Sequence, residues 1–247
     1  KWFLIVGILA ANTNIDYDAH TITVDESIYY PNRTASQLNT FVLAVVPNLW
    51  AGSFNLTNIE IDDTPTTTYS LEGQKLEIAL SSLLQPGSII KIDIQYTLDL
   101  PFAEQEDPNI SRPRIYGYTT RQMNLTNWYP FVVPYINGEW VLHEPWVYGE
   151  HLVYDSADYE VNISFTDFAS APIVAASGFP EQKESFIRYT INAARTFALS
   201  ASREFQVSAL QVGDVTVSSY YFAFNEAAGQ AALQTSAEAV QIFSDRY

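Results

Sequence analysis

Residues 89–100, IIKIDIQYTLDL, alternate between apolar and polar side chains along almost their whole length. The polar positions are Lys91, Asp93, Gln95, Thr97 and Asp99, and the apolar or aromatic positions are Ile90, Ile92, Ile94, Tyr96, Leu98 and Leu100. A period of two is typical of a strand that packs one face on a core and exposes the other, as in antiparallel sheets. The stretch therefore predicts a long antiparallel strand.

The same period recurs through most of the chain. Residues 159–165 repeat it, and further strands are predicted at 21–30, 40–46, 76–80, 173–176, 186–191, 197–200 and 214–224. Turn-forming pairs separate several of these segments, at Pro47-Asn48, Glu72-Gly73, Pro86-Gly87, Asn137-Gly138 and Ser177-Gly178. Many short strands with such spacing predict a mainly β protein, built as a sandwich or a curved double sheet.

The pattern changes at the C-terminal end, where one helix is predicted. Asn225 is a suitable N-cap, and the residues expected to form the buried stripe are Ala232, Leu233, Ser236, Val240 and Phe243. The polar residues expected on the opposite face are Gln230, Gln234, Glu238 and Gln241. A single amphipathic helix needs a partner surface, because short helices are marginal unless they pack.

The composition excludes several function classes. The 247 residues include 12 basic and 28 acidic side chains, which gives a net charge of −16. Such a charge repels a phosphate backbone, so nucleic-acid binding is not expected. The absence of cysteine removes disulfides, thiolate nucleophiles and cysteine-bound zinc. A soluble, acidic protein is expected.

The N-terminal segment KWFLIVGILAA is apolar or small after Lys1. It has the length of a signal-peptide core and is too short to span a bilayer. Three interpretations stay open for residues 2–11: a first buried strand, which is favoured, a remnant of an export segment, or a membrane anchor. Five Asn-x-Ser/Thr sequons matter only if the source glycosylates exported proteins, and they begin at Asn32, Asn55, Asn109, Asn124 and Asn162.

Residues 124–159 contain a pair that imitates half of a zinc-peptidase signature. His143 and Glu144 would open an HExxH motif, but Val147 stands where the second histidine is required. The motif works on a helix, where residues four apart share a face, and Pro145 discourages that turn. The pair is therefore not the HExxH site. A metal site of His143, Glu144, Glu150 and His151 has no recognised ligand spacing, and ordinary loop polarity is favoured.

Other chemistries were weighed for the same region and for the acidic loop. The aromatic side chains that would present flat faces to a sugar, if they are not core residues, are Trp128, Tyr129, Trp140, Trp146 and Tyr148. Glu104, Glu106 and Asp107 form an acidic loop, for which a solvated surface is favoured over a glycosidase pair. The sequence has no Gly-x-Ser-x-Gly elbow that would single out a serine nucleophile.

Seven segments, taken in order across residues 15–202, resemble the N-terminal part of zinc aminopeptidases of the alanyl-aminopeptidase and leukotriene-hydrolase family, especially bacterial exported members. They are IDYDAHTITVDESIYYPN (15–32), FVLAVVPNLW (41–50), LLQPGSIIKIDIQYTLDLP (83–101), LTNWYPFVVPYINGEW (125–140), YGEHLVYDSADYEVNISF (148–165), IVAASG (173–178) and ARTFALSAS (194–202). The resemblance rests on the order of the segments and implies export to the cell envelope or medium.

The resemblance implies a saddle-like antiparallel β-sandwich that covers one side of a thermolysin-like catalytic domain. In this family the HExxH helix, a third glutamate ligand and a catalytic tyrosine follow in the catalytic domain, and this sequence contains none of them. Zinc is therefore implied for the parent protein, and no cofactor or metal is expected on this chain. The family's β domain also contributes a glutamine or glutamate that holds the substrate's free amine, for which Gln122 is the nearest candidate.

The sequence thus predicts a β-sandwich domain over residues 1–205 and the start of a catalytic domain over residues 206–247. The expected function is to frame the active-site cleft of a zinc aminopeptidase for peptide substrates, with the chain inactive alone and its own downstream domain as its partner. The alternative is a free-standing β-sandwich that binds a glycan or a protein. Substrate preference and oligomeric state stay open.

Overall fold

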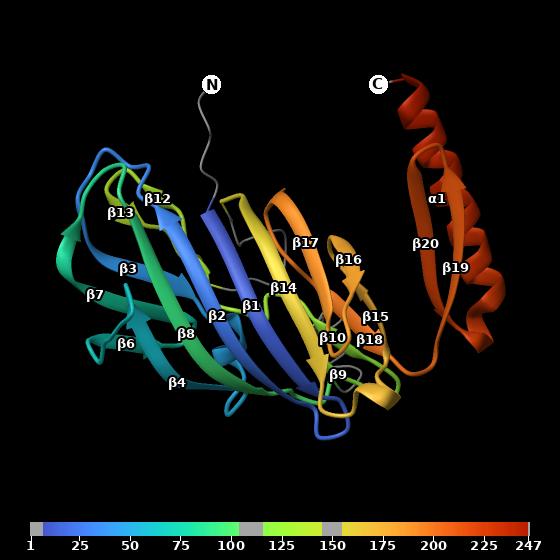
Figure 1. Cartoon of the computed structure of the whole chain (residues 1–247), viewed down its shortest axis with the longest axis horizontal. Helices are drawn as coiled ribbons and strands as arrows, with labels where there is room; N and C mark the ends of the chain where they lie inside the picture. Colours follow the sequence, from blue (N-terminus) through green and yellow to red (C-terminus); the bar gives the residue numbers. More distant parts are fainter. Residues whose placement is uncertain (1–6, 104–115, 145–154, 247) are drawn as a thin grey trace.

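The computed structural model describes residues 7–103, 116–144 and 155–246, and its largest layer is a curved sheet of eight strands (Figure 1). Spatial order and sequence order differ in this sheet. Its strands are, in spatial order, β16 (Phe179–Gln182), β17 (Ile187–Ala194), β14 (Ala157–Phe165), β1 (Gly7–Asp16), β2 (Thr21–Pro31), β8 (Ile89–Asp99), β4 (Phe54–Ile61) and β5 (Thr64–Pro65).

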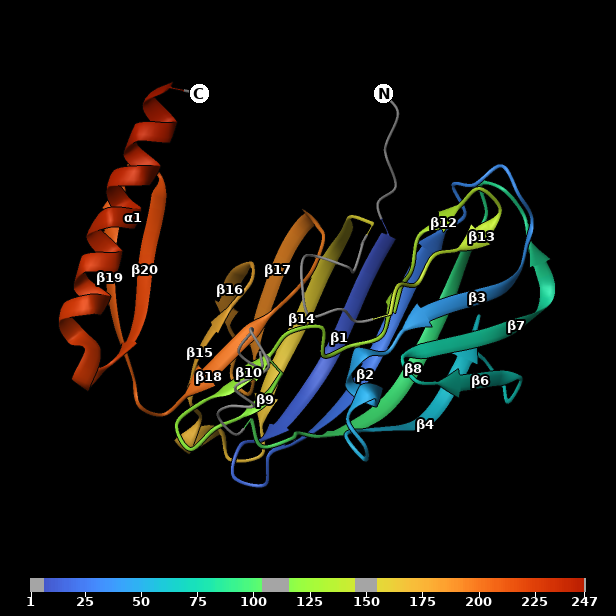
Figure 2. The same cartoon turned by 180° about the vertical axis from the view of Figure 1, so that it is seen from behind.

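Two four-stranded sheets lie against one face of this large sheet, as the view from behind shows (Figure 2). One contains β11 (Phe131–Val132), β3 (Leu38–Ala44), β7 (Lys75–Leu84) and β6 (Tyr69–Glu72). The other contains β15 (Ile173–Ala176), β18 (Leu199–Ser202), β10 (Met123–Leu125) and β9 (Tyr116–Tyr118). The predicted mainly β, saddle-like sandwich is confirmed.

The smaller elements complete the described chain. A short hairpin pairs β12 (Tyr135–Ile136) with β13 (Glu139–Trp140), and a longer one pairs β19 (Phe205–Val212) with β20 (Val215–Phe222). Three short 3-10 turns are η1 (Val46–Leu49), η2 (Phe168–Ser170) and η3 (Ala223–Asn225), and the last leads into the helix α1 (Glu226–Arg246). Among the described helices none is long and apolar enough to cross a bilayer.

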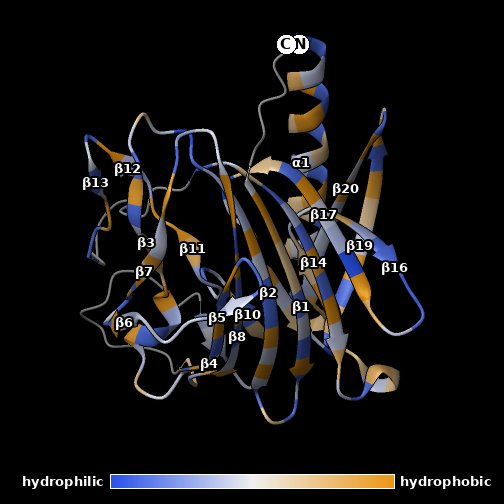
Figure 3. Ribbon diagram, turned by 60° about the vertical axis from the view of Figure 1, so that its left-hand side comes forward, coloured by the Kyte–Doolittle hydropathy of each residue, from blue (hydrophilic) through white to orange (hydrophobic). Residues whose placement is uncertain are grey.

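Strand β8 is the stretch that decides the fold. It pairs with β2 in unbroken register, from Thr21 opposite Asp99 to Pro31 opposite Ile89, and it pairs with β4 on its other side. Its apolar positions from Ile90 to Leu98 are all buried, because the pleat directs every second side chain onto the smaller sheets. The alternation of apolar and polar residues along β1, β2 and β14 is visible as alternating colour (Figure 3).

Strands β1 and β14 form a parallel pair within an otherwise antiparallel large sheet. A parallel pair needs a long connection, and here the chain between the two strands builds all of the β11-β3-β7-β6 sheet and half of the β15-β18-β10-β9 sheet. The described part of the apolar N-terminal segment, residues 7–11, is the start of β1, so the strand interpretation of that part is confirmed. Export of the protein stays a prediction.

Three of the differences between the predicted and the observed strands have physical reasons. The strand predicted at 40–46 ends at Ala44, because a 3-10 turn begins at Val46 with Pro47 near its start. Strand β4 was not predicted, because a β-bulge between Leu56 and Asn58 shifts its apolar positions by one residue and breaks the period of two. The strand predicted at 214–224 is β20, which ends at Phe222 where η3 starts.

Helix α1 packs on the β19–β20 hairpin, and its buried face differs from the predicted stripe. The fully buried residues are Gly229, Leu233 and Ala237, with Val240 partly buried. Ala232, Ser236 and Phe243 face outward, and Phe243 is 62% exposed. The prediction of those three as core residues was wrong, because a face with mostly small side chains approaches the hairpin closely. A Cβ on Gly229 would lie 2.4 Å from Tyr221 Cγ.

One carboxyl group lies inside the sandwich. Glu26 on β2 is 2% exposed, and its Oε2 accepts a hydrogen bond of 3.0 Å from Tyr96 Oη. Burial raises the pKa of Glu26 well above its usual range, although the Tyr96 hydrogen bond opposes that effect. Its second oxygen, Oε1, has no hydrogen-bond partner among the described residues. Burial therefore favours the protonated, uncharged form of this group.

Candidate functional site

The His143–Glu144 pair follows β13 and is exposed. The His143 backbone carbonyl accepts a hydrogen bond of 2.7 Å from Gln74 Nε2, so the main chain is anchored while the imidazole faces solvent. Glu150 and His151, the other two members of the alternative metal site, lie outside the described residues. Within residues 7–103, 116–144 and 155–246 there is no group of three or more histidine, aspartate or glutamate side chains able to hold a metal ion.

Two of the aromatic residues considered for sugar binding are core residues. Trp128 and Tyr129 are 0% and 1% exposed, so neither presents a face to a ligand. Trp140 is half-buried and packs against Phe41 and Tyr135. The sugar-binding role considered for Trp128 and Tyr129 is therefore wrong, because large aromatic rings fill the sandwich interior. Two further candidates and the acidic loop lie outside the described residues, namely Trp146, Tyr148, Glu104, Glu106 and Asp107.

Gln122 occupies the tight turn between β9 and β10. Its backbone carbonyl accepts a hydrogen bond of 2.8 Å from the Thr119 N–H, which closes the turn. Its side chain is half-buried, and its Nε2 donates to Asn124 Oδ1 at 3.3 Å. The amide is thus held along the turn by a single long hydrogen bond, a weak restraint.

The neighbouring Arg121 joins this turn to the β19–β20 hairpin. Its Nη1 lies 3.0 Å from Glu204 Oε2, and its guanidinium carbon lies 4.6 Å from the centroid of the Phe224 ring. The Arg121 carbonyl accepts a hydrogen bond of 2.6 Å from Ser202 Oγ. The β9–β10 turn therefore contacts the connection to the hairpin, its strand β20 and η3.

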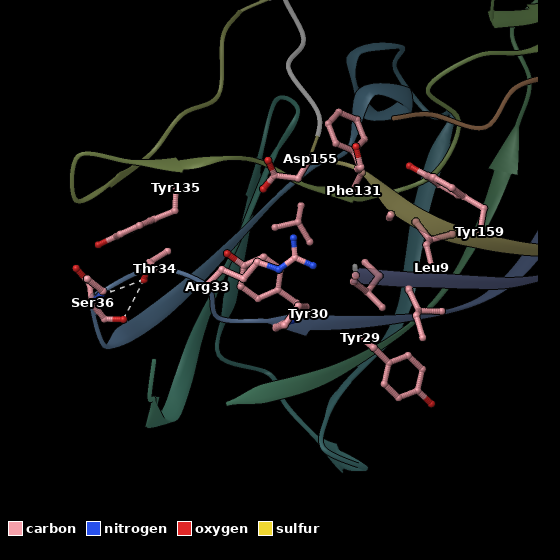
Figure 4. Close-up of a pocket in the computed structure, with 18 of the residues that line it drawn as sticks. Leu9, Tyr29, Tyr30, Arg33, Thr34, Ser36, Phe131, Tyr135, Asp155 and Tyr159 are labelled. Atoms are coloured by element: carbon pink, nitrogen blue, oxygen red, sulfur yellow. Dashed lines mark hydrogen bonds between the residues drawn. The ribbon is translucent and has the colours of Figure 1, made fainter. Parts of the chain in front are cut away.

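A pocket of about 800 Å³ lies at the other end of the sandwich, where β1 and β14 begin and β2 ends (Figure 4). Leu9 and Tyr159 contribute apolar surface from β1 and β14, and Phe131 contributes it from β11. Figure 4 shows Arg33 and Asp155 directed toward the same part of the pocket, with those three side chains to one side of them. The pocket thus combines an apolar wall with two opposite charges.

The electrostatics of this pocket centre on Tyr30. Burial raises its pKa to about 12, and the nearby Asp155 carboxylate adds to this effect while the Arg33 guanidinium opposes it. The phenol is therefore neutral at physiological pH. Both charged side chains are close enough to Tyr30 to influence its ionisation, although each is itself exposed.

The loop that carries Arg33 is held by the buried side chain of Asn32. Its Nδ2 donates to the carbonyls of Ser36 and Leu84 at 2.9 and 3.0 Å. Its Oδ1 accepts from the N–H and the hydroxyl of Thr34 at 3.0 and 2.7 Å. Asn32 therefore fixes the loop, and its amide is not accessible for glycosylation in the folded chain.

Aromatic side chains behind the pocket pack together and hold Tyr30 and Tyr135 in place. Tyr30 packs edge-on against Phe41, with ring centroids 4.9 Å apart, and Trp140 packs against both Phe41 and Tyr135. Trp140 Nε1 also donates to the Thr40 carbonyl at 3.2 Å. The sequence did not predict this pocket, because its residues come from segments more than a hundred positions apart. The local pattern that could have indicated the pocket is the Asn-x-Thr motif in an irregular segment after a predicted strand.

Comparison with known proteins identifies solved structures that share this fold. No protein-family model and no curated protein matches the chain significantly. Among solved structures, the M1 zinc metallopeptidase from Deinococcus radiodurans matches 90% of this chain and 48% of its own, with a TM-score of 0.55 and 14% identity.

Two mutant structures of M1 zinc metallopeptidases give the same result. The Deinococcus radiodurans mutant bound to a Tyr-Ser-Ala substrate matches 87% of this chain and 46% of its own, with a TM-score of 0.55 and 15% identity. A two-domain M1 zinc metallopeptidase mutant bound to L-tryptophan matches 87% and 47%, with a TM-score of 0.55 and 14% identity. The chain has the fold found in M1 zinc metallopeptidases and spans about half the length of these structures, which confirms the expected resemblance in fold.

Proposed function

We propose that this chain is the non-catalytic β domain of a zinc aminopeptidase of the M1 type, with the first elements of the catalytic domain attached. The observation that carries the proposal is the fold match over 87–90% of this chain to about half of each M1 structure. In this proposal residues 1–205 frame the active-site cleft for peptide substrates, and residues 206–247 open the catalytic domain.

In this proposal the zinc ion is not bound by this chain. The residues that the structure describes offer no cluster of three or more metal-binding side chains, so they do not fit a zinc site. The ion would be held by the downstream catalytic domain, which is also the natural partner of the β domain. The chain itself contributes shape and position to the cleft and carries out no chemical step.

The contacts of the β9–β10 turn support the proposal that the β domain adjoins a separate catalytic domain. Arg121 packs on Phe224, so the turn touches the part of the chain assigned to the catalytic domain, and its ion pair with Glu204 lies just before that part. Gln122 is the adjacent residue, and its amide makes one long hydrogen bond to Asn124. Within the proposal, Gln122 releases this hydrogen bond and its amide then reaches the free amine of a substrate. Breaking one long hydrogen bond in an exposed turn costs little free energy.

The coding sequence downstream of Tyr247 tests this proposal. The expected result is an HExxH signature in a predicted helix, followed by a further glutamate ligand. A reading frame without that signature would rule out the peptidase assignment. The domain would then be a free-standing β-sandwich that binds a partner.

A further inference from the structure

The pocket at the start of β1 contains one basic and one acidic side chain among its described lining residues, Arg33 and Asp155. In the described part of the chain, neither forms an ion pair with any residue within 4.0 Å, and they are not paired with each other. Two opposite charges therefore face one cavity without neutralising each other.

The rest of the pocket suits an apolar group. Leu9, Phe131 and Tyr159 form its buried floor, and three further lining residues, Tyr30, Val132 and Tyr135, are only partly buried and offer accessible surface. The volume of about 800 Å³ lies in the range of small-molecule pockets, roughly 300–1,000 Å³. Such pockets combine apolar walls with a few polar groups that fix the orientation of the ligand.

We propose that this pocket binds a zwitterion with a large apolar side chain, either a free α-amino acid or a short peptide. The planar guanidinium of Arg33 offers two parallel N–H donors to the ligand carboxylate. Asp155 accepts hydrogen bonds from the ligand ammonium group, and the neutral Tyr30 phenol lies beside both charges. The side chain of the ligand packs against the partly buried Val132 and Tyr135, above the floor formed by Leu9, Phe131 and Tyr159.

The pocket lies far from the turn that carries Gln122. Gly7 at the start of β1 lines the pocket, and Tyr17 just after the end of β1 donates to the Arg121 carbonyl at 3.5 Å. A strand rises roughly 3.3 Å per residue, so the ends of the ten-residue β1 are roughly 30 Å apart. The zwitterion site is therefore independent of the proposed peptidase function, and the two are tested separately.

Calorimetric titration of the purified protein with matched phenylalanine derivatives tests the site. L-phenylalanine and the dipeptide Phe-Phe are expected to bind, and the stronger of the two identifies the amino acid or the peptide as the ligand. N-acetylphenylalanine lacks the ammonium group and phenylalaninamide lacks the carboxylate, so each is expected to bind at least about tenfold more weakly than L-phenylalanine.

Two pocket variants provide the residue-level test. Arg33→Gln is expected to weaken L-phenylalanine about tenfold without affecting phenylalaninamide, and Asp155→Asn to weaken it similarly without affecting N-acetylphenylalanine. Arg246→Gln and Asp245→Asn make the same chemical changes at the exposed end of α1 and are expected to bind like the unmodified protein. Circular dichroism confirms that each variant is folded. Absence of binding by both zwitterions, equal binding of the blocked derivatives, or equal effects of the control variants would overturn the proposal.

Discussion

Glu26 is a residue whose ionisation is strongly altered by the fold. It stands in the middle of β2, in the series of side chains that otherwise reads Ile22, Val24 and Ile28 on the buried face. A carboxylate in that position would lose its hydration with one hydrogen bond as compensation, so the protonated form is favoured. The strand keeps its register because the apolar residues on both sides outweigh this single polar position.

The pH dependence of stability follows from Glu26. Its pKa is raised in the folded state, whereas the unfolded chain releases the proton near the ordinary value of about 4.3. As pH rises from that value through the folded pKa, the unfolded state binds fewer protons than the folded state, so the free energy of unfolding falls. The glutamine of Glu26→Gln does not titrate. Between about pH 4 and neutrality, the free energy of unfolding of this variant is therefore expected to rise relative to that of the unmodified protein.

Urea unfolding at a series of pH values measures this effect. Glu72→Gln changes an exposed glutamate in the same way and is expected to keep the pH dependence of the unmodified protein. Parallel stability profiles for Glu26→Gln and the unmodified protein would show that Glu26 titrates normally in the fold.

At the scale of elements, Gly229 determines how α1 packs. Alanine in place of glycine normally stabilises a helix by about 1 kcal/mol. Here the new Cβ would meet the Tyr221 ring at 2.4–2.7 Å, so the helix must shift away from β20. Gly229→Ala is therefore expected to destabilise the β19–β20–α1 unit by on the order of 1 kcal/mol or more, since overpacking outweighs helix propensity.

Hydrogen exchange of the α1 amides, measured by mass spectrometry, checks this expectation. Ser236→Ala changes an exposed position of the same helix and is expected to slow exchange slightly, because alanine is the better helix former. Slower exchange in Gly229→Ala as well would mean that the helix does not press on Tyr221.

The elements show which structural features local sequence patterns can predict. Strand β8 and the position of α1 follow from unbroken periodicity, because burial on one face leaves a regular record in the sequence. Strand β4 does not, since its bulge reverses the alternation midway. The pocket around Arg33 forms where segments far apart in the sequence come together, and local sequence patterns do not predict such contacts. Gln122 was proposed from family resemblance, and its role stays a prediction.

At the scale of the whole molecule, Arg121 is a side-chain link between the sandwich and the β19–β20–α1 unit. Its ion pair with Glu204 is about half exposed on both sides, so it contributes little to the stability of the fold. Arg121→Ala is expected to lower the free energy of unfolding by less than about 1 kcal/mol. It is also expected to loosen the orientation of the unit, since the contact with the Phe224 ring is lost.

Limited proteolysis at the connection near Arg203 and Glu204 distinguishes these two effects. Arg121→Ala is expected to be cleaved there several-fold faster than the unmodified protein. Lys75→Ala removes a surface ion pair with Glu77 on another sheet and serves as the control. Equal cleavage rates for all three proteins would show that Arg121 does not hold the unit in place.

The central claim is that the chain frames the cleft of a zinc aminopeptidase while the chemistry lies in a downstream domain. The most direct measurement compares the complete natural protein with residues 1–247, using zinc analysis and hydrolysis of aminoacyl-4-nitroanilides. The account predicts bound zinc and hydrolysis in the complete protein and neither in residues 1–247. Hydrolysis by residues 1–247 with added zinc, or a complete protein that binds no zinc and cleaves no substrate, would contradict it.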